Sequence, residues 1–358
     1  MNQPEEDAKG KIMSTVLPAT MKALVLKAGP DDRMHPSKRL ELVEKPMPVL
    51  AKGEVLVKME AASANPSDLQ SIGGRYSVNA APGQTLGIEG VGRVVASKAG
   101  PLGMFLKGRR VAVARPEGEG VWAEFAAVGA AYCIPVGDNL PMESAAAFVV
   151  NPFTSYALIR MAHKKRAMAV IQTAGAGQVG RGVIALARAA RIETISIVRR
   201  EEQVALLKEF GAKHVISQDD KQLDAKLKAL CNELQPGLFF DCVGGPITAH
   251  VMAQMPAFSD AVIYGYLEDN SPHPLGGHFP ARAVIYKSQT IRAFWLAPFF
   301  AELGQIGGLR ASLDIIKLFK SGVFKTKVAS VSAIDDYPAA LDAYAASMTR
   351  GKALLTFS

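Results

Sequence analysis

The period of the apolar residues changes near Met142. Before it, short apolar runs at residues 21–26, 40–44 and 54–60 are separated by glycine and proline, which is typical of strands in a loop-rich antiparallel sheet. After it, strand-like runs alternate with stretches of helical period, among them a helix predicted at residues 309–320. Repeated β-α units predict a parallel sheet with right-handed crossovers.

These patterns divide the chain into four parts, and its 358 residues are enough for two hydrophobic cores. The predicted parts are a disordered extension (1–20), a β-rich catalytic domain (21–145), a parallel α/β domain (146–322) and a segment returning to the first domain (323–358). Further strands are predicted at residues 120–128 and from Lys325 onward. The acidic run Glu5-Glu6-Asp7 argues against a secretory signal or transit peptide, so we expect a cytoplasmic protein, with mitochondria as the other compartment considered.

An apolar run at residues 170–174 meets a glycine turn and continues with helical period to residue 190. Gly175, Gly177 and Gly180 match G-x-G-x-x-G, in which the first glycine allows the turn, the second lets a pyrophosphate approach and the third lets helix and strand pack closely. The helix start at Gln178 and Val179 offers N–H groups to an anion. The pattern predicts a dinucleotide site.

The strand predicted at residues 193–198 is followed by Arg199 and Arg200. An NAD site would have a carboxylate here to hold the ribose 2′-hydroxyl. Two guanidinium groups attract a 2′-phosphate instead, and they bind it bidentately. The pair therefore predicts NADPH as the cofactor. The alternative is a solvated basic pair at the end of the strand.

Composition narrows the class of protein. Hydrophobic residues make up 49% and charged residues 21% of the chain, and no apolar run is long enough to cross a membrane. The net charge of +8 comes from Lys and Arg scattered among acidic residues, so we expect no nucleic-acid partner. Three scattered cysteines exclude a disulfide framework and indicate a reducing compartment.

Several short motifs, taken together and in order, resemble the medium-chain dehydrogenase/reductase superfamily. They are Asn65-Pro66-Ser67-Asp68, Gly87-x-Glu89-Gly90, Asn151-Pro152-x-Thr154-x-Tyr156, the glycine turn, Val198-Arg199, Asp241-Cys242-Val243-Gly244-Gly245 and Phe294-Trp295-Leu296. The resemblance is to the zinc-free branch, which holds quinone oxidoreductases and mitochondrial-type enoyl thioester reductases. It implies an α/β fold, in which a GroES-like antiparallel β domain is combined with a Rossmann doubly wound parallel sheet.

The zinc-dependent alcohol dehydrogenases of this superfamily hold their metal with two cysteines and a histidine. The matching positions here are Asn65, Ile88 and approximately Val150, none of which supplies a thiolate or an imidazole. Residues 97–110, where a structural zinc lobe would lie, contain no cysteine. We therefore expect no metal.

Without a Lewis acid to stabilise an alkoxide, reduction of a polarised C=C bond is the easier chemistry. The enolate that forms needs hydrogen-bond donors and a proton source. Tyr76 falls where enoyl thioester reductases carry their catalytic tyrosine, so the resemblance implies a proton-donating phenol. The alternative is a loop aromatic that only packs over the cleft.

The resemblance implies further site residues, each with a plainer alternative. Asn65 orients the substrate or nicotinamide, or forms an Asx turn before Pro66. Thr154 contacts the cofactor, or caps its helix. Trp295 contacts substrate and Phe294 the cofactor, or both belong to a core or dimer interface.

Three positions after strands are expected to let the cofactor approach the backbone, and these are Val243, Gly244 and Gly265. Lys352 reaches a cofactor phosphate, or is solvated.

The resulting prediction is an NADPH-dependent reductase of activated C=C bonds that favours 2-enoyl thioesters of CoA or acyl carrier protein and forms a homodimer. Thr173 and Ala176 depart from the Asn and Ser of the enoyl reductase pattern, which keeps a quinone or enone reductase as an alternative. An alternative of another class is a non-catalytic, crystallin-like NADPH-binding protein.

Overall fold

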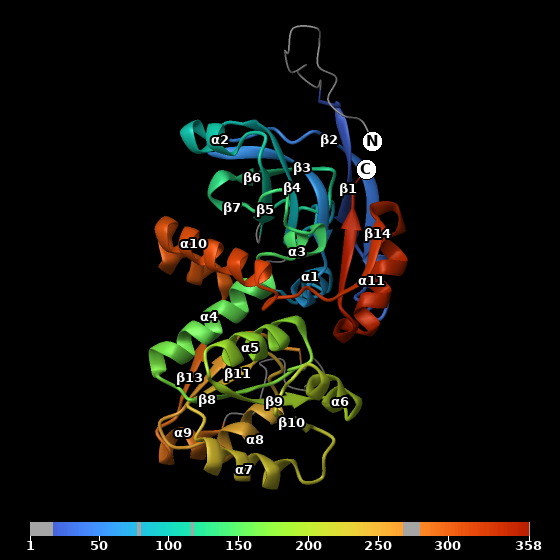
Figure 1. Ribbon diagram of the computed structural model, residues 1–358. Coiled ribbons are helices and arrows are strands. Elements are labelled where there is room, and N and C mark those ends of the chain that lie inside the picture. Colours follow the sequence, from blue (N-terminus) through green and yellow to red (C-terminus); the bar gives the residue numbers. More distant parts are fainter. Residues whose placement is uncertain (1–16, 77–79, 116–117, 268–279, 358) are drawn as a thin grey trace.

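The computed structural model describes residues 17–76, 80–115, 118–267 and 280–357. Short apolar runs broken by glycine and proline build a seven-stranded sheet of order β14-β15-β3-β4-β5-β7, with β6 paired to β3. A two-stranded sheet, β1-β2, lies beside it (Figure 1). The strands are β1 (Thr20–Leu26), β2 (Leu40–Pro46), β3 (Glu54–Ser63), β4 (Glu89–Ser97), β5 (Arg110–Ala114), β6 (Phe125–Gly129), β7 (Cys133–Pro135), β14 (Val328–Ala333) and β15 (Lys352–Thr356).

A second sheet of six parallel strands has the order β10-β9-β8-β11-β12-β13. Its strands are β8 (Ala169–Gln172), β9 (Glu193–Val198), β10 (His214–Ser217), β11 (Leu238–Asp241), β12 (Asp260–Ile263) and β13 (Thr290–Ala293). Its crossovers contain α5 (Gln178–Ala189), α6 (Glu202–Glu209), α7 (Leu223–Leu234), α8 (Pro246–Gln254) and α9 (Ala281–Tyr286). The strand order reverses between β8 and β11, and ligands bind doubly wound sheets at such a point.

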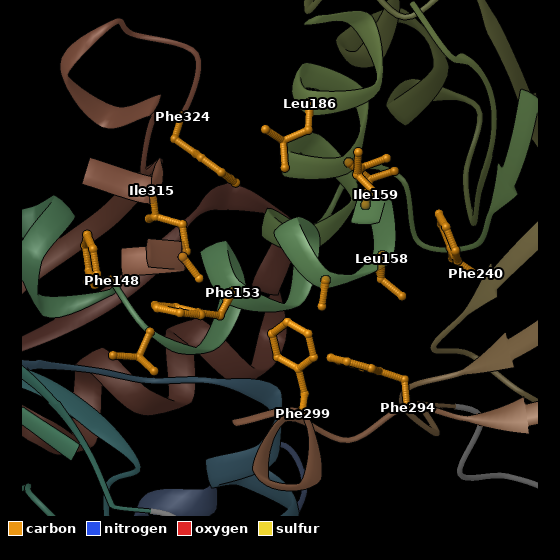
Figure 2. Packing of buried hydrophobic residues seen from close by; sticks show 14 of the residues in the cluster. Phe148, Phe153, Leu158, Ile159, Leu186, Phe240, Phe294, Phe299, Ile315 and Phe324 are labelled. Carbon is orange, nitrogen blue, oxygen red and sulfur yellow. The ribbon is translucent and has the colours of Figure 1, made fainter. Parts of the chain in front are cut away.

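Two helices lie between the sheets, α4 (Val150–Lys165) and α10 (Leu296–Lys320), which kinks at Gly304 (Figure 1). They bury an aromatic-rich cluster that includes Phe148, Phe153, Phe299 and Phe324 (Figure 2). Phe153 packs against Phe300 of α10 with ring centroids 4.8 Å apart. This packing holds the two halves of the molecule together around the space between them.

The remaining helices are α1 (Pro66–Ile72), α2 (Gly100–Leu106), α3 (Met142–Ala146) and α11 (Tyr337–Ala346), with short 3₁₀ turns η1 (Pro36–Arg39), η2 (Ala130–Tyr132), η3 (Ile334–Asp336) and η4 (Met348–Arg350). The predicted fold class is confirmed, since the antiparallel sheet and the parallel sheet are both present. The domain boundaries near residues 145 and 322 stay a prediction, because α4 and α10 pack on each other across the junction.

Three sequence-based assignments of secondary structure are wrong in part. The tail from Lys325 is not all strand, because Ala340, Leu341 and Tyr344 form a buried helical stripe on α11. The strand predicted at 120–128 is shortened to β6, although Trp122 is fully buried beside it. The helix predicted at 309–320 begins at Leu296.

The extension predicted for residues 1–20 falls mostly outside the described residues, since the description starts at residue 17. β1 already begins at Thr20.

Candidate active site

A cleft of about 1800 Å³ opens between the two sheets. Its walls come from both halves of the molecule, because Tyr76 follows α1, Thr154 lies on α4, and Gly177 and Arg199 follow strands of the parallel sheet. The carboxyl ends of β8 and β11 face it. The cleft therefore lies at the reversal of strand order.

The glycine turn connects β8 to α5 and leaves no space for a side chain at Gly175 or Gly180. A Cβ atom on Gly175 would lie 2.9 Å from the Cβ of Ser196, and one on Gly180 would lie 2.5 Å from the carbonyl oxygen of Gly175. Gly177 is the N-cap of α5 and lines the cleft with Gln178 and Val179, whereas Gly175 packs against β9 behind it. The first N–H groups of α5 are thus presented to the cleft, as an anion site requires.

Arg199 and Arg200 follow β9, are exposed and line the same cleft. Their backbone N–H groups both donate to Oε1 of Gln203, at 3.0 and 3.1 Å. Arg200 also pairs with Glu202, with 3.0 Å between Nε and Oε1. Gln203 was not predicted as a site residue, because its only signal in the sequence is its position at the start of α6.

Tyr76 and Trp295 meet in the wall of the cleft. Nε1 of Trp295 donates a hydrogen bond to the hydroxyl oxygen of Tyr76 at 3.2 Å. Burial raises the pKa of Tyr76 above its usual 10, and the negative charge of Asp68 adds to this effect. The phenol therefore stays protonated at neutral pH. Phe294 also lines the cleft, but it is largely buried against Phe299.

The positions after β11 and β12 are only partly in the cleft. Val243 and Gly265 line it. Gly244 does not belong to its lining, because its positive φ turns the backbone toward Tyr266, and a Cβ there would lie 2.6 Å from that ring. A side chain at Gly244 would clash with Tyr266, and the contact of Gly244 with the cofactor stays a prediction.

Asn65 is fully buried and does not line the cleft, so its predicted contact with substrate is wrong in this structure. Its Nδ2 donates to Glu89 at 3.0 Å, and its Oδ1 accepts from Asn151, whose Nδ2 lies 3.2 Å away. Asn151 does line the cleft. Asn151 belongs to the motif Asn151-Pro152-x-Thr154-x-Tyr156, but no role was predicted for its side chain.

Lys352 is not solvated, since only 1% of it is exposed. Its ammonium group contacts Asn65, the carbonyl of Ala64 at 3.1 Å and Glu89 at 3.4 Å. The alternative of a solvated lysine is therefore wrong, whereas contact with a cofactor phosphate stays a prediction, since Lys352 borders the cleft. Burial lowers the pKa of this lysine, and Glu89 opposes the effect.

Thr154 lines the cleft from the second turn of α4. Its hydroxyl donates to the carbonyl of Val150 at 2.6 Å, so the alternative of an N-terminal cap is wrong.

The positions that match zinc ligands elsewhere lie around the same buried site. The N–H of Val150 donates to Glu89, and the N–H of Ile88 donates to Asp68. Within the ranges that the structure describes, no three His, Cys, Asp or Glu side chains are grouped to hold a metal. In those ranges no helix is both long and apolar enough to cross a bilayer.

Comparisons with known proteins agree with this architecture. Residues 51–138 match the family model of the alcohol dehydrogenase GroES-like domain, and residues 178–305 match that of zinc-binding dehydrogenases. The chain is 30% identical to the mitochondrial enoyl-[acyl-carrier-protein] reductase of Arabidopsis thaliana, covering 97% of this chain and 91% of that protein. It is 29% identical to the enzyme of the same name from Bos taurus, covering 98% and 92%.

Among solved structures, the chain is similar to a proposed NADPH:quinone reductase from Mesorhizobium loti. The TM-score is 0.88 and the identity 32%, over 96% of this chain and all of that chain. The relatives are thus named after two different classes of substrate, although they share one fold.

Proposed function

The chain belongs to the medium-chain dehydrogenase/reductase family, in its zinc-free branch, and from this premise we propose an NADPH-dependent reductase that acts preferentially on 2-enoyl thioesters. That the chain is an oxidoreductase follows from the family and its relatives. The observation that carries the proposal is that one cleft contains the glycine turn, the Arg199–Arg200 pair and the Tyr76 hydroxyl.

The residues present fit a dinucleotide. Gly180 packs directly on the backbone of Gly175, which brings the N-terminus of α5 to the cleft, and Gly177 lines the cleft as the N-cap of this helix. Arg199 and Arg200 supply two exposed guanidinium groups at the end of the neighbouring strand. Together they suit a pyrophosphate and a 2′-phosphate. This arrangement supports NADPH rather than NADH.

When bound, NADPH supplies a hydride for the β-carbon of the substrate. The side chains then have to stabilise the enolate and protonate its α-carbon. Tyr76 is protonated, because burial raises its pKa, and Trp295 holds its oxygen in the wall of the cleft. We assign the proton donation to Tyr76.

The relatives named enoyl-[acyl-carrier-protein] reductase match nearly the whole chain, which favours thioesters of acyl carrier protein or CoA. The similarity to a proposed quinone reductase supports the second candidate, reduction of a quinone or another enone. The non-catalytic NADPH-binding protein considered from the sequence is disfavoured by these relatives, which are named as reductases.

Oxidation of NADPH at 340 nm tests all three. We expect turnover with crotonyl-CoA and little with 9,10-phenanthrenequinone. The reverse preference would support a quinone reductase. Binding of NADPH with no turnover of either substrate would support the non-catalytic protein, and absence of NADPH binding would contradict the proposal.

We also propose a homodimer formed through β13. This strand is at the edge of the parallel sheet, its four residues are exposed, and Ile285 and Tyr286 on α9 next to it are exposed as well. An open apolar edge favours pairing with a second sheet. Light scattering should give twice the chain mass, and Ile291→Lys should halve it. A monomeric wild type would contradict this.

The cellular compartment of the protein is also a proposal. The relatives carry mitochondrial names, which keeps mitochondria as the second candidate compartment. We retain the cytoplasm as the proposal, and fractionation of cells producing the untagged full-length chain decides between the two.

A further inference from the structure

The N-terminus of α4 has no capping side chain of its own, because the N-cap residue is Val149. Pro152 has no N–H group, so the first turn presents the N–H groups of Val149, Val150 and Asn151. Two of these donate to a single oxygen, Oε2 of Glu89, at 3.0 and 2.8 Å. The helix is therefore capped by a carboxylate from β4, 60 positions earlier in the chain.

The other oxygen of Glu89 accepts from the last residue of β3 and from the N-cap residue of α1. Ser63 donates at 2.8 Å and Asn65 at 3.0 Å, and the ammonium of Lys352 lies 3.4 Å away. Glu89 and Lys352 are both fully buried. Hydrogen bonds and a nearby cation compensate a buried carboxylate for its lost hydration, and both are present here. The positive end of the α4 dipole adds to this.

The carboxylate of Glu89 contacts three segments that are distant from one another in the sequence. They are Asn65 just after β3, the start of α4, and the returning strand β15. The first two turns of α4 carry Asn151 and Thr154 into the cleft. Asn151 is also held by Asn65, which Glu89 itself orients. A shift of Glu89 would therefore move the cleft wall formed by α4 relative to the wall that carries Tyr76.

We propose that Glu89 is a positioning residue of the active site: its buried carboxylate, balanced by Lys352, fixes the start of α4 so that Asn151 and Thr154 meet the bound dinucleotide. This inference rests on the proposed function only in its use of NADPH as the ligand. Glu89 does not line the cleft, so it acts through α4.

The test compares Glu89→Gln with Glu60→Gln. Glutamine has the shape of glutamate but keeps only one acceptor oxygen. Either the hydrogen bonds that cap α4 or the hydrogen bonds that Ser63 and Asn65 donate to residue 89 are therefore lost. Lys352 also loses its counter-charge. Glu60 is a matched control on β3, since its carboxylate pairs with Arg110 at 2.7 Å and has no place in the α4 cap.

NADPH binding is measured by fluorescence titration well below the melting temperature of each variant. We expect Glu89→Gln to weaken NADPH binding at least tenfold and Glu60→Gln to change it less than twofold. Equal affinities of Glu89→Gln and the wild type would overturn the inference while leaving the proposed function intact. A wild type that does not bind NADPH would overturn both.

A second measurement needs no variant and decides the case in which Glu89→Gln does not fold. Hydrogen exchange of the wild type, resolved to single residues, reports on the two capped N–H groups. We expect Val149 and Val150 to exchange slowly, at rates like the interior of α4, although first-turn N–H groups have no intrahelical partner. Rapid exchange at both would show that the cap does not hold α4, and the inference would fail.

Discussion

The indole of Trp295 donates a hydrogen bond to the phenol oxygen of Tyr76, although 219 positions separate the two residues. Tyr76 follows α1 beside the first sheet, and Trp295 lies between the last strand of the parallel sheet and α10. The bond therefore crosses between the two halves of the molecule at the cleft where we propose that hydride and proton are delivered.

If Tyr76 donates the proton, Tyr76→Phe should lower kcat about 10²-fold or more, which is the usual scale for loss of a general acid. The NADPH dissociation constant should change little. Tyr337→Phe is a matched control, because it removes a hydroxyl that donates to the carbonyl of Leu40 at 3.1 Å, outside the cleft. Steady-state kinetics measures both variants. An unchanged kcat in Tyr76→Phe would leave the tyrosine as a packing residue.

Removal of both guanidinium groups in Arg199→Ala/Arg200→Ala should raise KM for NADPH by about 10² while leaving KM for NADH almost unchanged. A hydrogen bond to a charged group contributes about 1.5–3 kcal/mol, and about 1.4 kcal/mol corresponds to a factor of ten. Arg282→Ala, on the exposed surface of α9, is the control. An equal rise in KM for NADPH and for NADH would show that Arg199 and Arg200 do not recognise the 2′-phosphate.

Gly180→Ala should destabilise the fold and weaken NADPH binding, because the new Cβ would lie 2.5 Å from the carbonyl oxygen of Gly175. Overpacking of this kind costs about 1–3 kcal/mol. Gly308→Ala on α10 is the matched change, since its Cβ meets no atom within 4 Å. Thermal unfolding should show a lower Tm for Gly180→Ala and an equal or higher Tm for Gly308→Ala. A wild-type Tm in Gly180→Ala would contradict the close packing of the turn.

Asp68 should make the stability of the protein depend on pH. Burial raises the pKa of its carboxyl to about 7, with Glu89 adding to the rise and Lys352 opposing it. In the unfolded chain an aspartate titrates near pH 4. Between pH 4 and 7 the folded state therefore holds a proton that the unfolded state has released, so the free energy of unfolding falls as the pH rises.

The variant Asp68→Asn isolates this effect, because its amide oxygen still accepts one of the backbone hydrogen bonds from Asn65 and Ile88. From pH 5 to pH 7 the Tm of the wild type should fall relative to that of Asp68→Asn. Parallel Tm curves would mean that the Asp68 carboxyl titrates at its ordinary pKa in the folded protein.

Much of the parallel sheet was predictable, because its signals are local. β9 has the predicted bounds, since an apolar run of strand length between a turn and a helix permits few alternatives. The turn at Gly175–Gly180 was recognisable because glycine spacing reports on backbone geometry within a few residues. α11 was missed because its small alanines show little periodicity, and its burial depends on the sheet beneath it.

The sequence by itself determined which chemical groups the chain carries. They are a glycine turn suited to a dinucleotide, a basic pair after the second strand of the parallel sheet, and the loop residue Tyr76. Only the tertiary structure decided which groups meet. Asn65 and Lys352 were assigned to ligands, yet they surround the buried carboxylate of Glu89, a residue of a recognised motif for which the sequence predicted no role. The physical reason is that spacing encodes contacts within a helix or turn, whereas the compensation of a buried charge depends on residues brought together from β3, β4, α4 and β15.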